Sequence, residues 1–328
     1  MNQLSLFYFS LLPLCFTIAV VSERLLLPML CRLAKQPIYT DGPRWHLKKS
    51  GTPTMGGIAA VIAVTISAVC GIVLLAGQKR TDAAAHLLLL LFFCLSNALV
   101  GYIDDRKKLA HAHNEDGLRP KEKLLLQSVI AIVFLYLRTA LCGRPTHLSF
   151  SSVNIELGFF YYPLMLFLLL GIINCANLTD GVDGLAASVA FAIGISLFYL
   201  CRNESVEGSV LSIGLVGASL GFLCFNLHPA KVFMGDTGSL FFGALCCSVL
   251  FSIENPLLIL LFGGVYVIEG FSVVLQVLFY KVKHKRIFLM APLHHHFEKK
   301  GWSENKIAIS AILMTLFFSM IGALVWRL

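Results

Sequence analysis

Charged residues are scarce in this chain of 328 residues: Asp, Glu, Lys and Arg make up 13% of it, against roughly 25% in a typical soluble protein. Hydrophobic residues make up 57%. This balance excludes an ordinary soluble domain. Many apolar runs are longer than about 18 residues and are joined by short polar segments, which predicts membrane-spanning helices and not the short alternating strands of a β-barrel.

Several familiar patterns are also missing. The ten cysteines show no CxxC spacing and most lie inside apolar runs, so no disulfide framework is expected. The net charge of +8 comes without a basic stripe interleaved with aromatic residues, so we expect no nucleic acid partner. The GxxxxGK[ST] order of a phosphate-binding Walker loop is absent, as are repeats and low-complexity tracts. The apolar run at residues 4–30 is too long for a signal peptide and lacks a small-residue cleavage pattern, so we expect a retained first span.

We predict an all-α, polytopic integral membrane protein in one domain, residues 1–328, with about ten transmembrane helices. The predicted spans are residues 4–31, 55–77, 84–103, 122–142, 159–178, 184–201, 208–226, 238–253, 256–280 and 307–326. Most of the 26 Lys and Arg residues fall after odd-numbered spans. The positive-inside rule then makes these joints cytoplasmic and both termini external, or periplasmic. The external joint 143–156 alternates polar and apolar residues, which indicates a small hairpin.

Carboxylates gather at the ends of the spans on the predicted cytoplasmic side. Asp180 and Asp183 stand between two apolar runs, Asp104 and Asp105 follow the third span, and Asp236 lies in a glycine-flanked loop before the eighth. Each has an ordinary alternative, since acids cap helix starts, end helices in solvent and occupy turns. Five carboxylates from three joints on one face are nevertheless costly unless a cation or substrate relieves them. Oxygen ligands of this kind suit Mg²⁺, which commonly binds one or two carboxylates together with substrate phosphates.

Three consecutive histidines, His294, His295 and His296, lie on the same predicted face. Consecutive side chains cannot all point at one place in a helix or strand, so a zinc site built from all three is not expected. One of them placed in a site is the favoured interpretation, and a polar loop is the alternative.

Three further groups of residues give weaker indications of function or structure. The glycine- and threonine-rich segment 50–57 follows two lysines and would offer backbone N–H groups to an anion. Glu269 and Gln276 are seven residues apart on one face of the ninth span, and a carboxylate inside the membrane is a functional candidate. Glu23 and Arg24 in the first span are interpreted as a structural pair.

Five segments together resemble the MraY family, the bacterial phospho-N-acetylmuramoyl-pentapeptide transferases of the polyprenyl-phosphate N-acetylhexosamine-1-phosphate transferase superfamily. They are Gly51-Thr-Pro-Thr-Met-Gly-Gly57, Tyr102-Ile-Asp-Asp105, Asn177-Leu-Thr-Asp-Gly-Val-Asp-Gly184, Phe233-Met-Gly-Asp-Thr-Gly-Ser239 and Pro292-Leu-His-His-His-Phe-Glu298. The resemblance covers about residues 35–302. It departs from the family at Val182, where Leu is usual.

The resemblance implies transfer of phospho-MurNAc-pentapeptide from UDP-MurNAc-pentapeptide to undecaprenyl phosphate, which yields lipid I and UMP and requires Mg²⁺. It also implies ten helices in the bacterial cytoplasmic (inner) membrane, an active site on the cytoplasmic face, a ninth helix bent to open a lipid groove, and a homodimer. Peptidoglycan synthesis would be the process served.

The family's functional residues map onto positions of this sequence. The implied catalytic residues are Asp104, Asp105, Asp236 and His295, with Asp236 and Asp105 at the metal. The implied nucleotide subsite holds Lys49, Asp180, Asp183, Asn226 and Phe233, with Phe233 under the uracil. Further substrate-binding positions are Asn174, Gln276, His294 and His296.

Three alternatives stay open at this point. The lipid phosphate attacks the donor directly, or an aspartate first forms a covalent phospho-enzyme. A transferase for another UDP-N-acetylhexosamine would carry the same carboxylates. A cation-coupled transporter would place them near the bilayer midplane, whereas here they lie at span ends.

Overall fold

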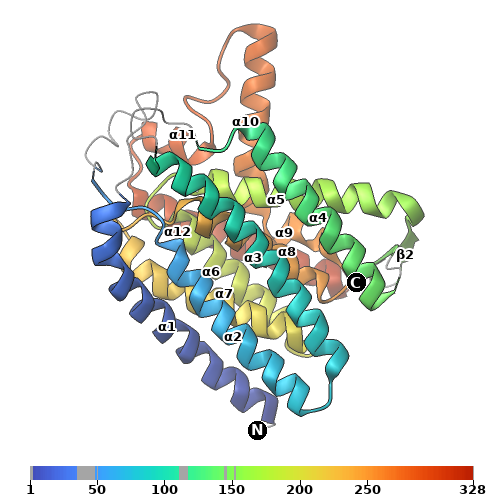
Figure 1. Ribbon diagram of the computed structural model, residues 1–328. Coiled ribbons are helices and arrows are strands. Elements are labelled where there is room, and N and C mark those ends of the chain that lie inside the picture. The colour runs from blue at the N-terminus through green and yellow to red at the C-terminus, as the bar shows by residue number, and fades with distance from the viewer. Residues whose placement is uncertain are drawn as a thin grey trace.

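The computed structural model describes residues 3–34, 49, 51–110, 117–143, 146–150 and 153–327, and these are mainly helical (Figure 1). The long helices are α1 (Gln3–Leu33), α2 (Gly57–Gly77), α3 (Thr81–Ala110), α4 (Pro120–Cys142), α5 (Tyr161–Thr179), α6 (Leu185–Cys201), α7 (Val206–Asn226), α8 (Gly235–Phe251), α10 (Gly264–Lys283) and α12 (Glu304–Arg327). The short elements are β1 (His147–Phe150), β2 (Val153–Glu156), η2 (Gly158–Phe160), η3 (Pro256–Leu258), α9 (Ile259–Phe262) and α11 (Leu293–Lys299). The predicted all-α membrane fold is confirmed. The predicted hairpin is confirmed too, because β1 and β2 pair antiparallel.

Each predicted span contains a long helix. Among the described residues, eight helices are long and apolar enough to cross a membrane, and α6 and α8 are shorter apolar helices of 17 residues each. The total of ten spans and the external termini stay predictions.

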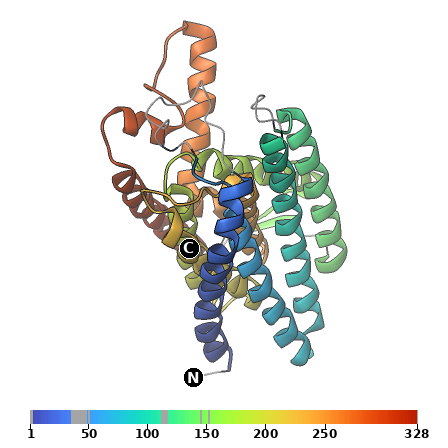
Figure 2. The ribbon, with the colours of Figure 1, turned by 60° about the vertical axis from the view of Figure 1, so that its left-hand side comes forward.

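The ninth predicted span, residues 256–280, is not one continuous helix. It divides into η3, α9 and α10, with the break at Gly263 and Gly264. Adjacent glycines weaken a helix, and the ring of Phe318 from α12 packs so closely that a Cβ on Gly264 would lie 2.9 Å from it. Beyond the break α10 extends away from the bundle (Figures 1 and 2) and exposes large apolar side chains such as Phe271 and Val282.

Helix α8 lies in the middle of the bundle and is buried along nearly its whole length, from Thr237 to Phe251. It packs against α3, α5, α7 and α2. A helix that is apolar all round requires such surroundings. Glycines set how closely its first turn is approached: a Cβ on Gly57 would lie 2.3 Å from the Cα of Gly238, and a Cβ on Gly101 would lie 2.2 Å from the carbonyl oxygen of Asp236.

The predicted pair of Glu23 and Arg24 is wrong. Glu23 is fully buried on α1, and neither carboxylate oxygen has a hydrogen-bond partner in the described part of the chain, whereas Arg24 is exposed. Adjacent residues on a helix do not face each other, so the two side chains diverge. Glu23 is therefore a buried carboxyl group without a hydrogen-bond partner among the described residues.

Replacing this carboxyl group is expected to stabilise the protein. Glu23→Met should raise the free energy of unfolding by roughly 1–3 kcal/mol, because the buried polar group is removed at similar volume. Thermal unfolding in detergent measures the effect, with Glu23→Gln as the matched control that keeps a buried polar group. A lower unfolding temperature for Glu23→Met would mean that the carboxyl group has a stabilising partner.

Candidate active site

Two groups of polar side chains lie at helix ends: one where α3 ends and α8 begins, and the other at the α5–α6 turn, the α7–α8 segment and the start of α12. We call Asp104, Asp105 and Asp236 the α8 cluster, because they surround the first turn of α8. We call Asp183, His228 and Glu304 the Glu304 cluster. Within each cluster one ligand atom from every member lies within 4.8 Å of the others. The segments that carry these residues were all predicted to lie on one membrane face.

Asp105 caps helix α8. Its Oδ1 accepts from the backbone N–H of Asp236 at 3.0 Å, and its Oδ2 accepts from the backbone N–H of Thr237 at 2.9 Å and from the Thr237 hydroxyl at 2.6 Å. The first N–H groups of a helix have no partner within the helix, and a carboxylate satisfies them while facing the positive end of the helix dipole. Asp105 therefore fixes α8, and with it Asp236, against the end of α3.

Two lysines neutralise the other members of the α8 cluster. Lys108 lies 2.7 Å from Asp104 and 3.1 Å from Asp236, and Lys123 lies 2.5 Å from Asp236. Asn177 donates to the second oxygen of Asp236 at 3.0 Å. None of these three residues was predicted as part of the site. The two lysines lie in basic segments whose excess charge predicts membrane orientation, and Asn177 lies inside a motif.

The α8 cluster fits a hard divalent cation. Its donors are carboxylate oxygens from α3 and α8, which is the ligand chemistry that Mg²⁺ prefers. Asp104 Oδ1 accepts from the Leu118 N–H at 2.7 Å, but Asp104 Oδ2 and Asp236 Oδ2 face the ammonium groups of Lys108 and Lys123, which a cation can displace. Both oxygens of Asp105 are bonded to the backbone and side chain of α8. Asp104 and Asp236 are therefore the members best able to bind a metal.

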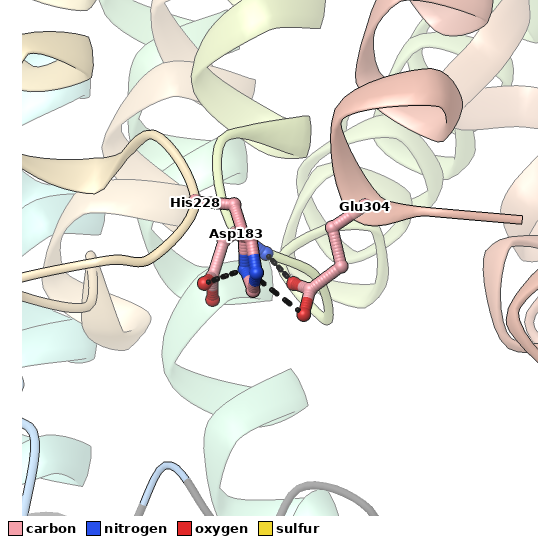
Figure 3. Close-up of side chains that lie close together, drawn as sticks. All are labelled: Asp183, His228 and Glu304. Atoms are coloured by element: carbon pink, nitrogen blue, oxygen red, sulfur yellow. Dashed lines mark hydrogen bonds and ion pairs between the residues drawn. The ribbon is translucent and has the colours of Figure 1, made fainter.

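The Glu304 cluster is built around Asp183 (Figure 3). Lys49 donates to Asp183 Oδ1 at 2.7 Å, while Asp183 Oδ2 lies 2.9 Å from His228 Nδ1 and accepts from the Ala230 N–H at 3.1 Å. Burial acts to raise the pKa of the Asp183 carboxyl, but these bonds outweigh it and hold the pKa below its usual value. Asp183 is thus an anion that already binds one ammonium group.

Asp180 lies between the two clusters. Its burial and the nearby carboxylates of Asp236, Asp105 and Asp183 raise the pKa of Asp180 to about 7. A cation bound nearby would favour the ionised form of the Asp180 carboxyl group.

Asn226 and Phe233 flank the segment that supplies His228. Asn226 is buried, accepts from the Gly184 N–H at 3.0 Å and donates to the Val232 carbonyl at 2.8 Å. It therefore ties the turn that carries Asp183 to the segment that leads to Phe233. Phe233 is half-buried, so part of its ring remains available to a ligand.

Gly56 and Gly57 do not offer their N–H groups to an anion. The N–H of Gly56 donates to the carbonyl of Phe233 at 2.9 Å, and that of Gly57 donates to the carbonyl of Met234 at 3.0 Å. The anion-binding interpretation is therefore wrong for these two glycines. They allow the start of α2 to lie against the start of α8, while Lys49 reaches the Glu304 cluster.

The three histidines point to different partners, as expected for consecutive residues. His294 is buried, and both its backbone N–H and its Nδ1 contact Glu269 Oε2, at 3.3 and 3.2 Å. Its Nε2 packs on the Asp180–Asp183 turn, where a Cβ on Gly181 would lie 2.3 Å away. His295 Nδ1 lies 2.6 Å from Glu298, and His296 Nδ1 accepts from the Leu289 N–H at 3.1 Å. His294 thus lies against Glu269 and the turn that carries Asp180 and Asp183, and the catalytic role of His295 stays a prediction.

Two predicted substrate-binding residues lie outside both clusters. Asn174 donates to Gln127 at 2.9 Å, and Gln276 binds the backbone of Ile287 and Phe288. Gln276 therefore attaches the segment before α11 to α10. Their contacts with substrate stay predictions.

Comparison with known proteins gives one consistent result. Residues 87–254 match the family described as Glycosyl transferase family 4, and residues 49–59 match the phospho-N-acetylmuramoyl-pentapeptide-transferase signature 1. The chain is 41% identical over 315 residues to a phospho-N-acetylmuramoyl-pentapeptide-transferase of Bacillus velezensis, with 94% of each chain covered. It is 40% identical over 315 residues to that of Halalkalibacterium halodurans, with 95% of each covered. For that of Clostridium botulinum strain Alaska E43 the identity is 39% over 316 residues, covering 95% of this chain and 94% of the relative.

Proposed function

This chain belongs to the phospho-N-acetylmuramoyl-pentapeptide-transferase family, and we propose that it transfers phospho-MurNAc-pentapeptide from UDP-MurNAc-pentapeptide to undecaprenyl phosphate. The products are lipid I and UMP. One observation carries the proposal: carboxylates and lysines from separate joints converge on the first turn of α8 at one end of a membrane bundle. Two anionic phosphates, one soluble and one lipid-borne, can meet only at such a place.

The reaction forms a bond between an oxygen of the lipid phosphate and the β-phosphorus of the donor. The bond from that phosphorus to the bridging oxygen breaks, and UMP leaves with the oxygen. Negative charge converges as this happens, so fixed positive charge lowers the barrier. Lys108 and Lys123 supply it at the α8 cluster, where their ammonium groups lie beside Asp236.

The proposed cofactor is Mg²⁺, held by Asp236 and Asp104. When bound it would screen the phosphate oxygens and polarise the β-phosphorus. Asp105 would act differently from the metal ligand implied by the family resemblance, because its oxygens hold the start of α8. Asn177 would orient Asp236 through the bond to its other oxygen.

Direct attack by the lipid phosphate is the mechanism we propose. The carboxylates of Asp236 and Asp104 each bind ammonium groups, and Asp105 is bonded to α8, so each carries contacts that oppose nucleophilic attack on an anionic phosphorus centre. A covalent phospho-aspartate would require breaking these contacts without an evident gain.

The proposed location is the bacterial inner membrane, with the site on the cytoplasmic face. The excess of Lys and Arg in the segments that carry the site supports this orientation. The lipid bilayer supplies the acceptor, and we propose a homodimer of single-domain chains.

A direct assay tests the function. Purified protein in detergent with Mg²⁺, UDP-MurNAc-pentapeptide and undecaprenyl phosphate should release UMP and form a lipid-linked product. Release of UMP only from a different UDP-N-acetylhexosamine would assign the chain to that donor. The absence of UMP release with either donor would refute transferase activity.

Nucleoside recognition is expected to depend on Asp183 and Phe233. Asp183→Ala removes an acceptor for the uracil imide N–H, and Phe233→Ala removes an aromatic face worth roughly 1–3 kcal/mol of stacking. Both variants should bind UMP more weakly and show a higher KM for the donor. Lys49→Ala acts through charge, so its effect should shrink as salt rises.

UMP affinity, measured by titration calorimetry, checks this prediction. Phe159→Ala is the matched control, because Phe159 is an exposed aromatic residue beside the hairpin. Normal UMP affinity combined with slow turnover in Asp183→Ala and Phe233→Ala would place these residues in the chemical step instead.

A further inference from the structure

Glu304 is where four distant parts of the chain meet. It is the first residue of α12, and its side chain is 13% exposed. Its Oε2 accepts from Lys49 Nζ at 2.6 Å. The same oxygen accepts from the Asp183 backbone N–H at 2.8 Å, and Oε1 lies 3.3 Å from His228 Nδ1 (Figure 3). The carboxylate thus joins the segment before α2, the α5–α6 turn and the α7–α8 segment to α12.

These contacts determine where the Lys49 ammonium group points. A lysine ammonium has three N–H donors. Among the described residues, two are directed at carboxylates: Asp183 Oδ1 at 2.7 Å and Glu304 Oε2 at 2.6 Å. The described residues leave the third donor available to a ligand, and the two bonds hold the long side chain that carries it in one direction.

The same carboxylate also fixes Asp183 from the backbone side. The Asp183 N–H donates to Glu304, while the Asp183 carboxylate binds Lys49, His228 and the Ala230 N–H. The main chain of Asp183 is therefore held by Glu304, and its side chain is held by Lys49, His228 and the Ala230 N–H. Ordering these groups before the ligand arrives lowers the entropy lost on binding.

We propose that Glu304 is a positioning residue for the nucleotide: acting through Lys49 and the Asp183 amide, it holds the surface that receives a uridine nucleotide. The inference rests on the proposed function. It extends that function to α12, a helix that none of the family motifs in the sequence includes. Glu304 itself does not touch the reacting phosphates.

The variant Glu304→Gln tests the proposal, because it removes the charge that holds Lys49 and keeps an oxygen for the Asp183 N–H. UMP affinity should fall about tenfold, as expected for a lost charge-assisted hydrogen bond. The KM for the UDP donor should rise by a similar factor, while kcat and the KM for undecaprenyl phosphate stay near wild type. Glu304→Asp should recover part of the UMP affinity. Glu204→Gln, the same change at an exposed residue between α6 and α7, should behave as wild type.

A double-mutant cycle with Lys49→Ala decides whether Glu304 acts through Lys49. The double variant should bind UMP no more weakly than Lys49→Ala alone. Additive losses, or a Glu304→Gln variant with unchanged UMP affinity, would overturn the inference while leaving the function intact. A wild-type protein that binds no UMP would instead refute the proposed function, and the cycle measured by thermal unfolding would still report whether the two side chains are coupled.

Discussion

Asp236→Asn is expected to reduce turnover by about 100-fold or more, the loss typical of removing one electrostatic element from a reacting centre. The neutral amide keeps the size of the side chain but loses the charge that attracts a hard cation. Lys108 and Lys123, which now lie beside Asp236, would also lose their shared partner. The Mg²⁺ concentration for half-maximal activity should rise in whatever activity remains.

The measurement is UMP release across a Mg²⁺ titration. Asp82→Asn is the matched control, since Asp82 is exposed in the first turn of α3, at the other end of that helix. Wild-type turnover with an unchanged Mg²⁺ titration in Asp236→Asn would remove Asp236 from the metal site.

Asp105→Asn is expected to lose both stability and turnover. An amide offers one acceptor oxygen where the carboxylate offers two, so it cannot accept from both the Asp236 and Thr237 backbone N–H groups as Asp105 now does. Loss of a helix cap costs typically 0.5–2 kcal/mol, so the free energy of unfolding should fall by roughly that amount. Turnover should fall by more than about tenfold, because Asp236 follows the first residue of α8 and moves with it.

The two carboxylates are distinguished by measuring the unfolding temperature and the Mg²⁺ titration together. Asp105→Asn should lower the unfolding temperature and leave the Mg²⁺ midpoint of the residual activity unchanged. Asp236→Asn should leave the unfolding temperature unchanged and raise the Mg²⁺ midpoint. Thr237→Val, which removes only the hydroxyl bond to Asp105, should give a smaller loss of stability. A shifted Mg²⁺ midpoint with normal stability in Asp105→Asn would restore Asp105 to the metal, as the family resemblance implies.

The helices were predictable because their signal is local. A run of apolar residues as long as a bilayer is thick has few alternatives to a helix. The convergence of Asp105 and Asp236 was also predictable, since both stand at span ends on one predicted face. The family resemblance implied a bent ninth helix, but the position of the break at Gly263 could not be predicted, because a hydropathy run says nothing about which helix packs against the glycine backbone.

Bonds between particular side chains of distant segments could not be predicted from the sequence. Glu304 looks like an ordinary acid at a helix start, and its bond to Lys49 spans 255 positions. Glu23 and Arg24 looked like a pair because they are neighbours, although helix geometry separates them. Lys108 and Lys123 belong to basic clusters whose simplest explanation is membrane orientation, which concealed their contacts with Asp236.

The close approach of glycines around α8 limits how this site can change over time. A Cβ atom at Gly57 would lie only 2.3 Å from the Cα of Gly238, and one at Gly101 would lie only 2.2 Å from the carbonyl oxygen of Asp236. Either substitution would therefore force the backbone of α8 to move. A substitution there that reshaped the site against a competing nucleoside analogue would also displace Asp236. Gly57 and Gly101 therefore have little freedom to vary, and a ligand that contacts only the α8 cluster beside them would leave few routes to resistance.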